Sequence, residues 1–201
     1  MANYVHNPDF PPIESVIDHR PPRLWLSGVL EVVEVPLEQY EEETGLNVAE
    51  FLAEYDQFQK HKRPTSPADP VTKARGFWDV PSEQFDGHFP DLAVLQGVQE
   101  DEAIAQLAAY AAAYKQPGQL GVLLGDLASR HFLPVPPDKM LLLGADILGW
   151  QKRTFVGKGE VSLANGMLAA EVTASGSVMK KEIQRETIRK AISAIEAGPS
   201  K

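Results

Sequence analysis

The sequence predicts an α+β domain in which an antiparallel sheet wraps around one buried central helix. The first observation is the stretch from Val98 to Tyr114, which is rich in alanine and almost continuously apolar on every face. A helix that is apolar all round must be buried all round. The second observation is that the chain after Pro117-Gly118 alternates extended apolar segments with short turns, as antiparallel strands do. A helix of this kind and a long antiparallel sheet pack as the layers of one domain.

The composition supports a single globular domain over residues 1–201. Of these residues 43% are hydrophobic and 23% are charged, which is ordinary for a chain with a sizeable core. The formal net charge of −9 argues against a surface that binds nucleic acid. The absence of cysteine excludes disulfides and thiolate metal sites.

No segment has the properties of a leader or a membrane span. The N-terminus has neither a basic start nor an apolar run. The most apolar window, Met140–Trp150, contains Asp146 and is too short to cross a bilayer. We therefore expect a cytoplasmic protein that does not insert into membranes.

The first half of the chain predicts two strands with an insertion between them. A short helical turn at Ile13–Ile17 precedes a buried strand at Leu24–Val35, which Pro36 ends. Extended structure resumes at Lys73–Val80 and leads to the Gly87-His88 turn. Residues of about 37–72 lie between these strands and are acidic at first, then basic, then punctuated by proline.

The insertion contains one predicted helix. Asn47 can cap it, and apolar residues recur at spacings of three and four, namely Val48, Phe51, Leu52, Tyr55 and Phe58. We expect this stripe to pack on its own domain. The alternative is that it serves as a lid or a docking surface.

The second half of the chain predicts four strands and a terminal helix. The strands are expected at Leu120–Leu127, Met140–Leu148, Thr154–Leu163 and Met167–Val178. Asn165-Gly166 is a strong hairpin-turn signal between the last two. An amphipathic helix at about 181–197 then ends at Gly198-Pro199.

Charge is unevenly distributed along the chain. Between Glu31 and Asp56 there are nine acids and no lysine or arginine, whereas residues 151–201 hold nine basic residues and five glutamates. Two solvent-exposed faces of opposite charge, one acidic and one basic, would explain this distribution. The alternative is that the C-terminal cations receive an acidic partner or a phosphate-bearing carrier, with the main contributions from Lys180, Lys181, Arg185, Arg189 and Lys190.

Groups suited to proton transfer beside a carbonyl gather around the start of the central helix. His88 is a candidate base because imidazole titrates near neutral pH. Glu102 is a candidate acid if an apolar pocket raises its pKa. Gly97 lies at the helix N-terminus, where a backbone N–H without an intrahelical partner can polarise a carbonyl. Glu100 and Asp101 stand beside Glu102 in a first turn where the helix dipole favours acids, which is the structural explanation for all three.

The other histidines do not indicate a metal site. His6, His19, His61 and His131 lack ligand spacings such as H-E-x-x-H, and we interpret them as structural residues.

Three motifs carry a resemblance to a known family. These are Gly87-His88-Phe89-Pro90, the pair Gly97-Val98, and Glu102-Ala103-Ile104-Ala105-Gln106. Together they resemble the signature of the bacterial (3R)-hydroxyacyl-[acyl carrier protein] dehydratases of fatty acid synthesis. The resemblance covers about residues 13–180 apart from the insertion.

The resemblance implies the hotdog fold and a hydro-lyase reaction. Water would be removed from a (3R)-3-hydroxyacyl thioester, on an acyl carrier protein or on coenzyme A, to give the trans-2-enoyl thioester in fatty acid or related acyl-chain biosynthesis. No cofactor and no metal are implied. The resemblance also implies a homodimer, or a higher oligomer built from it, with the two central helices side by side and the acyl chain in a tunnel between subunits.

The resemblance also assigns the site residues. His88 of one subunit would face Glu102 of the other as the catalytic pair, and Gln106 would orient Glu102. The substrate would contact Phe89, Pro90, Gly97 and Val98.

The sequence departs from the family pattern near the motif. Asp91-Leu92-Ala93 and Gln96 stand where the family usually has Gly-x-Pro and a proline before the second glycine. We therefore expect chain-length preference and carrier recognition to differ. Two alternatives stay open: a thioesterase in which Glu102 activates water, and a non-catalytic homologue that binds the acyl carrier.

Overall fold

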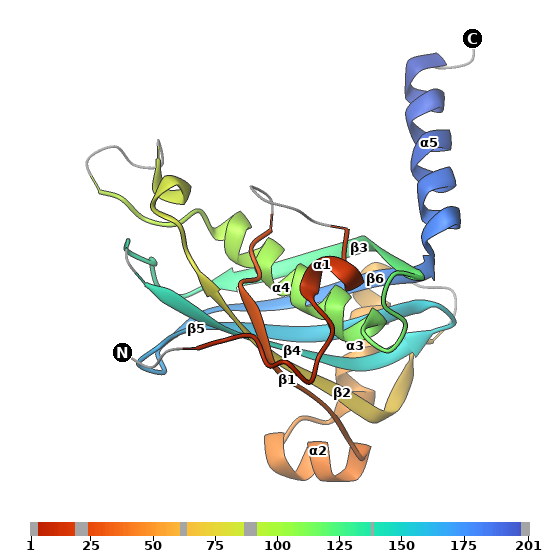
Figure 1. Cartoon of the computed structure of the whole chain (residues 1–201). Helices are drawn as coiled ribbons and strands as arrows, with labels where there is room; N and C mark the ends of the chain where they lie inside the picture. The colour runs from red at the N-terminus through yellow and green to blue at the C-terminus, as the bar shows by residue number, and fades with distance from the viewer. Residues whose placement is uncertain (1–3, 19–23, 61–63, 87–91, 138, 198–201) are drawn as a thin grey trace.

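A six-stranded antiparallel sheet forms most of the domain. The computed structural model describes residues 4–18, 24–60, 64–86, 92–137 and 139–197 (Figure 1). Within these residues the strand order is β1-β2-β4-β5-β6-β3. The strands are β1 (Gly28–Val35), β2 (Ser66–Asp79), β3 (Leu120–His131), β4 (Met140–Gln151), β5 (Thr154–Leu163) and β6 (Leu168–Lys180). The helices are α1 (Ile13–Val16), α2 (Leu37–Thr44), α3 (Val48–Gln59), the 3-10 turn η1 (Ser82–Phe85), α4 (Gly97–Ala113) and α5 (Lys181–Ala197).

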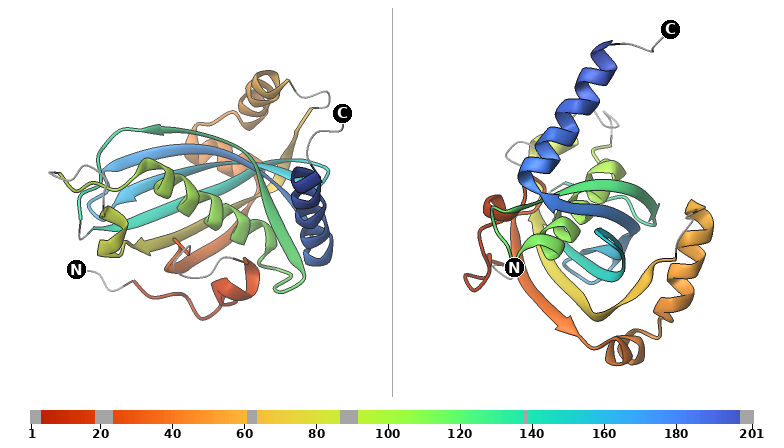
Figure 2. Two further views of the ribbon diagram at one scale, coloured as in Figure 1. Left: turned by 90° about the horizontal axis from the view of Figure 1, so that it is seen from above. Right: turned by 90° about the vertical axis from the view of Figure 1, so that its right-hand side faces the viewer.

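The predicted central helix is α4, and the sheet curves around it (Figure 2). Its interior residues, from Ala103 to Ala111, are all at most 9% exposed. They pack against Trp78, Leu141 and Phe155 of the surrounding strands in the main core. The prediction of a helix wrapped by an antiparallel sheet is therefore confirmed, although Val98 in the first turn is 68% exposed.

The inserted helices cover the opposite face of the sheet, as Figure 2 shows. A second core forms there, in which Val48 and Leu52 of α3 pack with Val71, Leu148 and Val156 of the strands. The Asn47 side chain accepts a 3.0 Å hydrogen bond from the Glu50 backbone N–H, which confirms the predicted cap of α3. Four of the five stripe residues are buried or partly buried, whereas Phe58 is 75% exposed. The expectation that the stripe packs on its own domain is thus met except at its last residue.

The boundaries of the insertion differ from the prediction. Strand β2 begins at Ser66, so residues 66–72 belong to the sheet rather than to a loop. Pro67 and Pro70 favour a loop in the sequence of this segment. In the structure, a register shift between Pro67 and Thr72 accommodates both prolines in the pairing of β2 with β4. Helix α2 was missed because its sequence, LEQYEEET, has no apolar periodicity.

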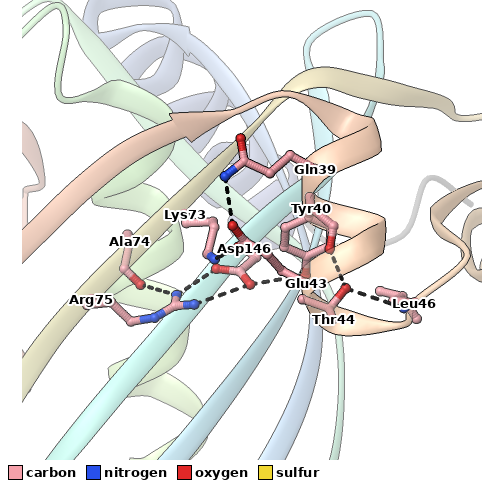
Figure 3. Close-up of polar contacts among 9 residues, drawn as sticks. All are labelled: Gln39, Tyr40, Glu43, Thr44, Leu46, Lys73, Ala74, Arg75 and Asp146. Carbon is pink, nitrogen blue, oxygen red and sulfur yellow. Dashed lines mark hydrogen bonds and ion pairs between the residues drawn. The ribbon is translucent and has the colours of Figure 1, made fainter.

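A polar network joins α2 to the outer face of the sheet (Figure 3). The Arg75 guanidinium on β2 donates to Asp146 on β4, with Nη1 and Oδ1 2.6 Å apart. The Tyr40 hydroxyl of α2 donates to Asp146 Oδ2 at 3.1 Å. Burial raises the pKa of Tyr40, and the Asp146 charge raises it further, so this phenol stays protonated as the donor. An ion pair between Lys73 of β2 and Glu43 of α2, with Nζ and Oε2 3.1 Å apart, adds to this network.

Among the residues described, no helix is long and apolar enough to cross a membrane.

The Asp146 network should contribute measurably to stability. Asp146→Asn removes the charge that Arg75 faces, and the half-buried guanidinium loses its hydrogen-bonded counterion. We expect the free energy of unfolding, measured with urea, to fall by about 1–2 kcal/mol. The control is Glu171→Gln in the exposed Lys158–Glu171 pair, whose separation is 3.5 Å; it should change stability by less than about 0.5 kcal/mol. Equal effects of the two substitutions would contradict this role of Asp146.

Candidate functional site

Glu102 and Gln106 form a hydrogen-bonded pair on α4. They are four residues apart and so lie on the same face of the helix. Gln106 is 1% exposed, and its Nε2 donates to Glu102 Oε1 at 3.0 Å. Its Oε1 accepts from the Trp25 backbone N–H at 2.9 Å, which fixes the amide so that its NH₂ group faces Glu102. The contact implied by the resemblance is present, and its catalytic role stays a prediction.

Glu102 lines a cavity of about 310 Å³ between α4, β3 and α5. Most of the lining is apolar, and Glu102 is the single ionisable residue among the described residues that line this cavity. Ala105 and Ala109 continue the wall along α4, and Phe155 of β5 contributes from the sheet. Small side chains on α4 leave room here for a ligand beside the carboxylate.

The predicted motif residues His88, Phe89 and Pro90 lie outside the described residues. On the N-terminal side of these residues the described chain is bonded to the first turn of α4, and on the C-terminal side it is bonded to the segment that follows β3. Gln99 Nε2 in the first turn of α4 donates to Gln84 Oε1 of η1 at 2.6 Å. The Leu95 N–H donates to the Val135 carbonyl at 2.8 Å.

Gly97 lies at the N-terminus of α4, as predicted, and a side chain at this position would require His131 to move. A Cβ on Gly97 would lie 2.8 Å from His131 Cε1, so the imidazole of β3 packs directly against this glycine. The neighbouring Val98 side chain is 68% exposed in the described structure. The structure thus gives Gly97 a packing requirement beside its predicted role as a donor.

The sequence interpretation missed a polar cluster between the start of α4 and β3. Glu100 is 2% exposed and Asp101 9% exposed. His131 Nε2 lies 3.2 Å from Asp101 Oδ1, and His131 Nδ1 lies 3.7 Å from Glu100 Oε2. The Ser129 hydroxyl donates to Asp101 Oδ2 at 2.9 Å. His131 therefore lies beside two buried acids, which its isolated position in the sequence did not indicate.

The environment of Glu100 changes its titration. Burial, and to a smaller extent the charge of Asp101, raise the pKa of this carboxyl from its ordinary value of 4.5 to about 7. One signal in the sequence could have predicted this. Three consecutive acids at the head of a helix that is buried on nearly all sides cannot all reach solvent.

The described residues contain no group of three or more His, Cys, Asp or Glu side chains arranged to hold a metal ion. What the site offers is a carboxyl group at one end of an apolar cavity, held by an oriented amide. Such a group can exchange a proton with a bound ligand.

Comparison with known proteins adds to this geometry. No protein-family model matches the chain. The chain is similar to the 3-hydroxyacyl-[acyl-carrier-protein] dehydratase FabZ of Bacillus licheniformis, with 32% identity over 132 residues that cover 61% of this chain and 91% of the relative. FabZ of Bacillus subtilis is 31% identical over 123 residues, which cover 56% of this chain and 86% of the relative.

Solved structures show the fold. A thioesterase superfamily member from Thermus thermophilus superposes with a TM-score of 0.54 at 13% identity, covering 62% of this chain and 93% of its own. A hot-dog-like protein from Thermanaerovibrio acidaminovorans gives a TM-score of 0.51 at 11% identity, and the match covers 59% of this chain and 89% of that protein. The predicted hotdog fold is confirmed.

Glu100 should make stability depend on pH. Its folded pKa of about 7 lies above its ordinary value of 4.5, so the folded state retains the proton across this window while the unfolded state loses it. The free energy of unfolding therefore falls as pH rises from 4.5 to 7, by about 3 kcal/mol.

Glu100→Gln should remove most of this slope. The measurement is urea unfolding at a series of pH values between 4 and about 8, where carboxyl groups of this kind titrate. The exposed Glu54→Gln serves as the control and should keep the wild-type slope. An unchanged slope in Glu100→Gln would show that this carboxyl is not the titrating group.

Proposed function

Since the chain belongs to the 3-hydroxyacyl-[acyl-carrier-protein] dehydratase family, we propose that it removes water from a (3R)-3-hydroxyacyl thioester to give the trans-2-enoyl thioester. The acyl group is carried by an acyl carrier protein or by coenzyme A. The reaction serves fatty acid synthesis or a related acyl-chain pathway. The observation that carries the proposal is Glu102, which is hydrogen-bonded to Gln106 and lines an apolar cavity.

Each step of the elimination has a residue assigned to it. His88 takes the α-proton, and the Gly97 N–H polarises the thioester carbonyl while charge develops on its oxygen. Glu102 gives a proton to the departing 3-hydroxyl, so the C–O bond breaks, the C=C bond forms and water leaves. The proton on His88 then returns to Glu102 through solvent, which restores both groups.

The two edges of the sheet support a homodimer. The β1 edge is partly occupied: the Asn7 N–H donates to the Val29 carbonyl at 2.8 Å, and the Val29 N–H donates to His6 Nδ1 at 3.1 Å. In contrast, β3 pairs with β6 on one side, and no other described segment pairs with its outer side. An open edge of this length favours pairing with another chain, here a second copy. In such a dimer His88 of one subunit would serve Glu102 of the other.

The catalytic assignment predicts two inactive variants. His88→Ala and Glu102→Gln should each lower the rate of hydration and dehydration by about 10²–10⁴-fold, because each removes one proton-transfer group. Turnover is followed by mass on 3-hydroxyacyl and trans-2-enoyl thioesters of both carriers. Glu83→Gln on η1, which is exposed, is the control and should keep the wild-type rate.

Other outcomes of the same assay would identify the alternatives. Normal rates in His88→Ala or Glu102→Gln would contradict the assignment. Free acid without any enoyl product would indicate a thioesterase in which Glu102 activates water. Binding of the acylated carrier without turnover would indicate a non-catalytic homologue.

The open β3 edge predicts the assembly. Light scattering should give at least twice the chain mass of 22.1 kDa. Leu124→Lys on β3 places a charge on a side chain that is 48% exposed and should shift the protein toward monomer. Val5→Lys, at a residue 73% exposed in the N-terminal segment, should leave the mass unchanged. A monomeric wild-type protein at all concentrations would contradict the dimer.

A further inference from the structure

The cavity beside Glu102 extends along α4 toward α5. Glu102, Ala105 and Ala109 lie on one face of α4, and they span about 10 Å at 1.5 Å of rise per residue. Strand β3 runs antiparallel to α4 beside this face, since its last residue, His131, packs on Gly97. The start of β3 therefore lies toward the C-terminal end of α4, which is where α5 is attached.

Helix α5 is held firmly at this end of the cavity. Gln184 is 7% exposed, and its Nε2 donates to the Val122 carbonyl of β3 at 2.9 Å. The amide fits closely over Gly121, where a Cβ would lie 1.9 Å from Gln184 Oε1. The Lys181 N–H donates to the Gln119 carbonyl at 3.0 Å, and Lys181 Nζ pairs with Asp18 at 3.0 Å. The first turn of α5 thus has a fixed position on the sheet.

The next turn of α5 presents Ile188 to the cavity. Ile188 is four residues after Gln184, hence on the same face of the helix, and both residues line the cavity. Ile188 is still 41% exposed, so its apolar surface is not covered by the described part of the chain. Figures 1 and 2 show that α5 projects away from the end of the sheet.

We propose that α5 is the end wall of the acyl-chain groove and that Ile188 sets the length of chain the protein accepts. This inference rests on the proposed function, because it takes Glu102 as the end of the groove where the reaction occurs. The wall between Glu102 and Ile188 is formed by Ala105, Ala109, Val122 and Phe155, which suits a hydrocarbon chain. A chain long enough to reach Ile188 covers its exposed surface, and a longer one meets α5.

The test compares variants of Ile188 on short, medium and long 3-hydroxyacyl thioesters. Ile188→Ala removes part of the wall, so kcat/KM should rise for longer chains by about fourfold for each additional methylene group that becomes buried. Ile188→Trp should do the reverse and lose the longer chains while keeping the short ones. Ile192→Ala is the matched control, since Ile192 is 50% exposed one turn further along α5 and is not among the cavity residues.

A binding measurement separates this inference from the proposed function. Calorimetric titration with saturated acyl-coenzyme A of increasing chain length measures binding in the groove without turnover. We expect the Ile188 variants to shift the preferred chain length in binding as they do in kcat/KM. If wild-type protein dehydrates its substrates but the Ile188 variants keep the wild-type length profile in both assays, α5 is not the end wall. If no thioester is dehydrated but the Ile188 variants bind acyl chains of a different preferred length, the proposed function is wrong and the assignment of α5 as the end wall is supported.

Discussion

The burial of α4 inside the curved sheet favours hydrogen-bond partners for the polar side chains in the interior of the helix. Gln106 satisfies its amide with the Trp25 N–H and with Glu102, and the Tyr110 hydroxyl donates to the Pro11 carbonyl at 2.6 Å. Leaving such a group unpaired in the core would cost about 1–3 kcal/mol. These bonds attach the N-terminal segment to the helix. Because Gln106 makes one of them, the same contacts that hold α4 in the sheet also hold the carboxyl of Glu102.

The opposite face of the sheet depends on the insertion. Val71, Leu148 and Val156 are each at most 1% exposed beneath α2 and α3. Strands buried on both faces have nearly continuous apolar sequences, which explains why β4 lacks a clear alternation of apolar and polar residues. The Tyr40–Asp146–Arg75 network then fixes α2 over these strands. The inserted helices are therefore part of the packed domain.

The sequence predicted best the elements with strong apolar patterns. Thr154–Leu163 and helix 181–197 have the predicted bounds, and α4 starts one residue earlier than predicted. Helix α2 was not predicted because it buries a single side chain, that of Tyr40, and so has no apolar pattern. In the site, the family resemblance implied the contact between Gln106 and Glu102, and the structure contains it. His131 could not be placed, because its position beside Gly97 depends on how β3 packs against α4, and local spacing carries no information on that packing.

The three acids at the head of α4 have different surroundings because successive helical residues point about 100° apart. Asp101 faces Ser129 and His131, Glu100 lies buried near the same imidazole, and Glu102 faces Gln106 and the cavity. Near neutral pH Glu100 keeps much of its proton. This limits the negative charge close to the Gly97 N–H, where a thioester oxygen would gain charge during the proposed reaction. Carboxylates at both Glu100 and Asp101 would oppose that charge, so the burial of Glu100 favours the chemistry proposed for Glu102.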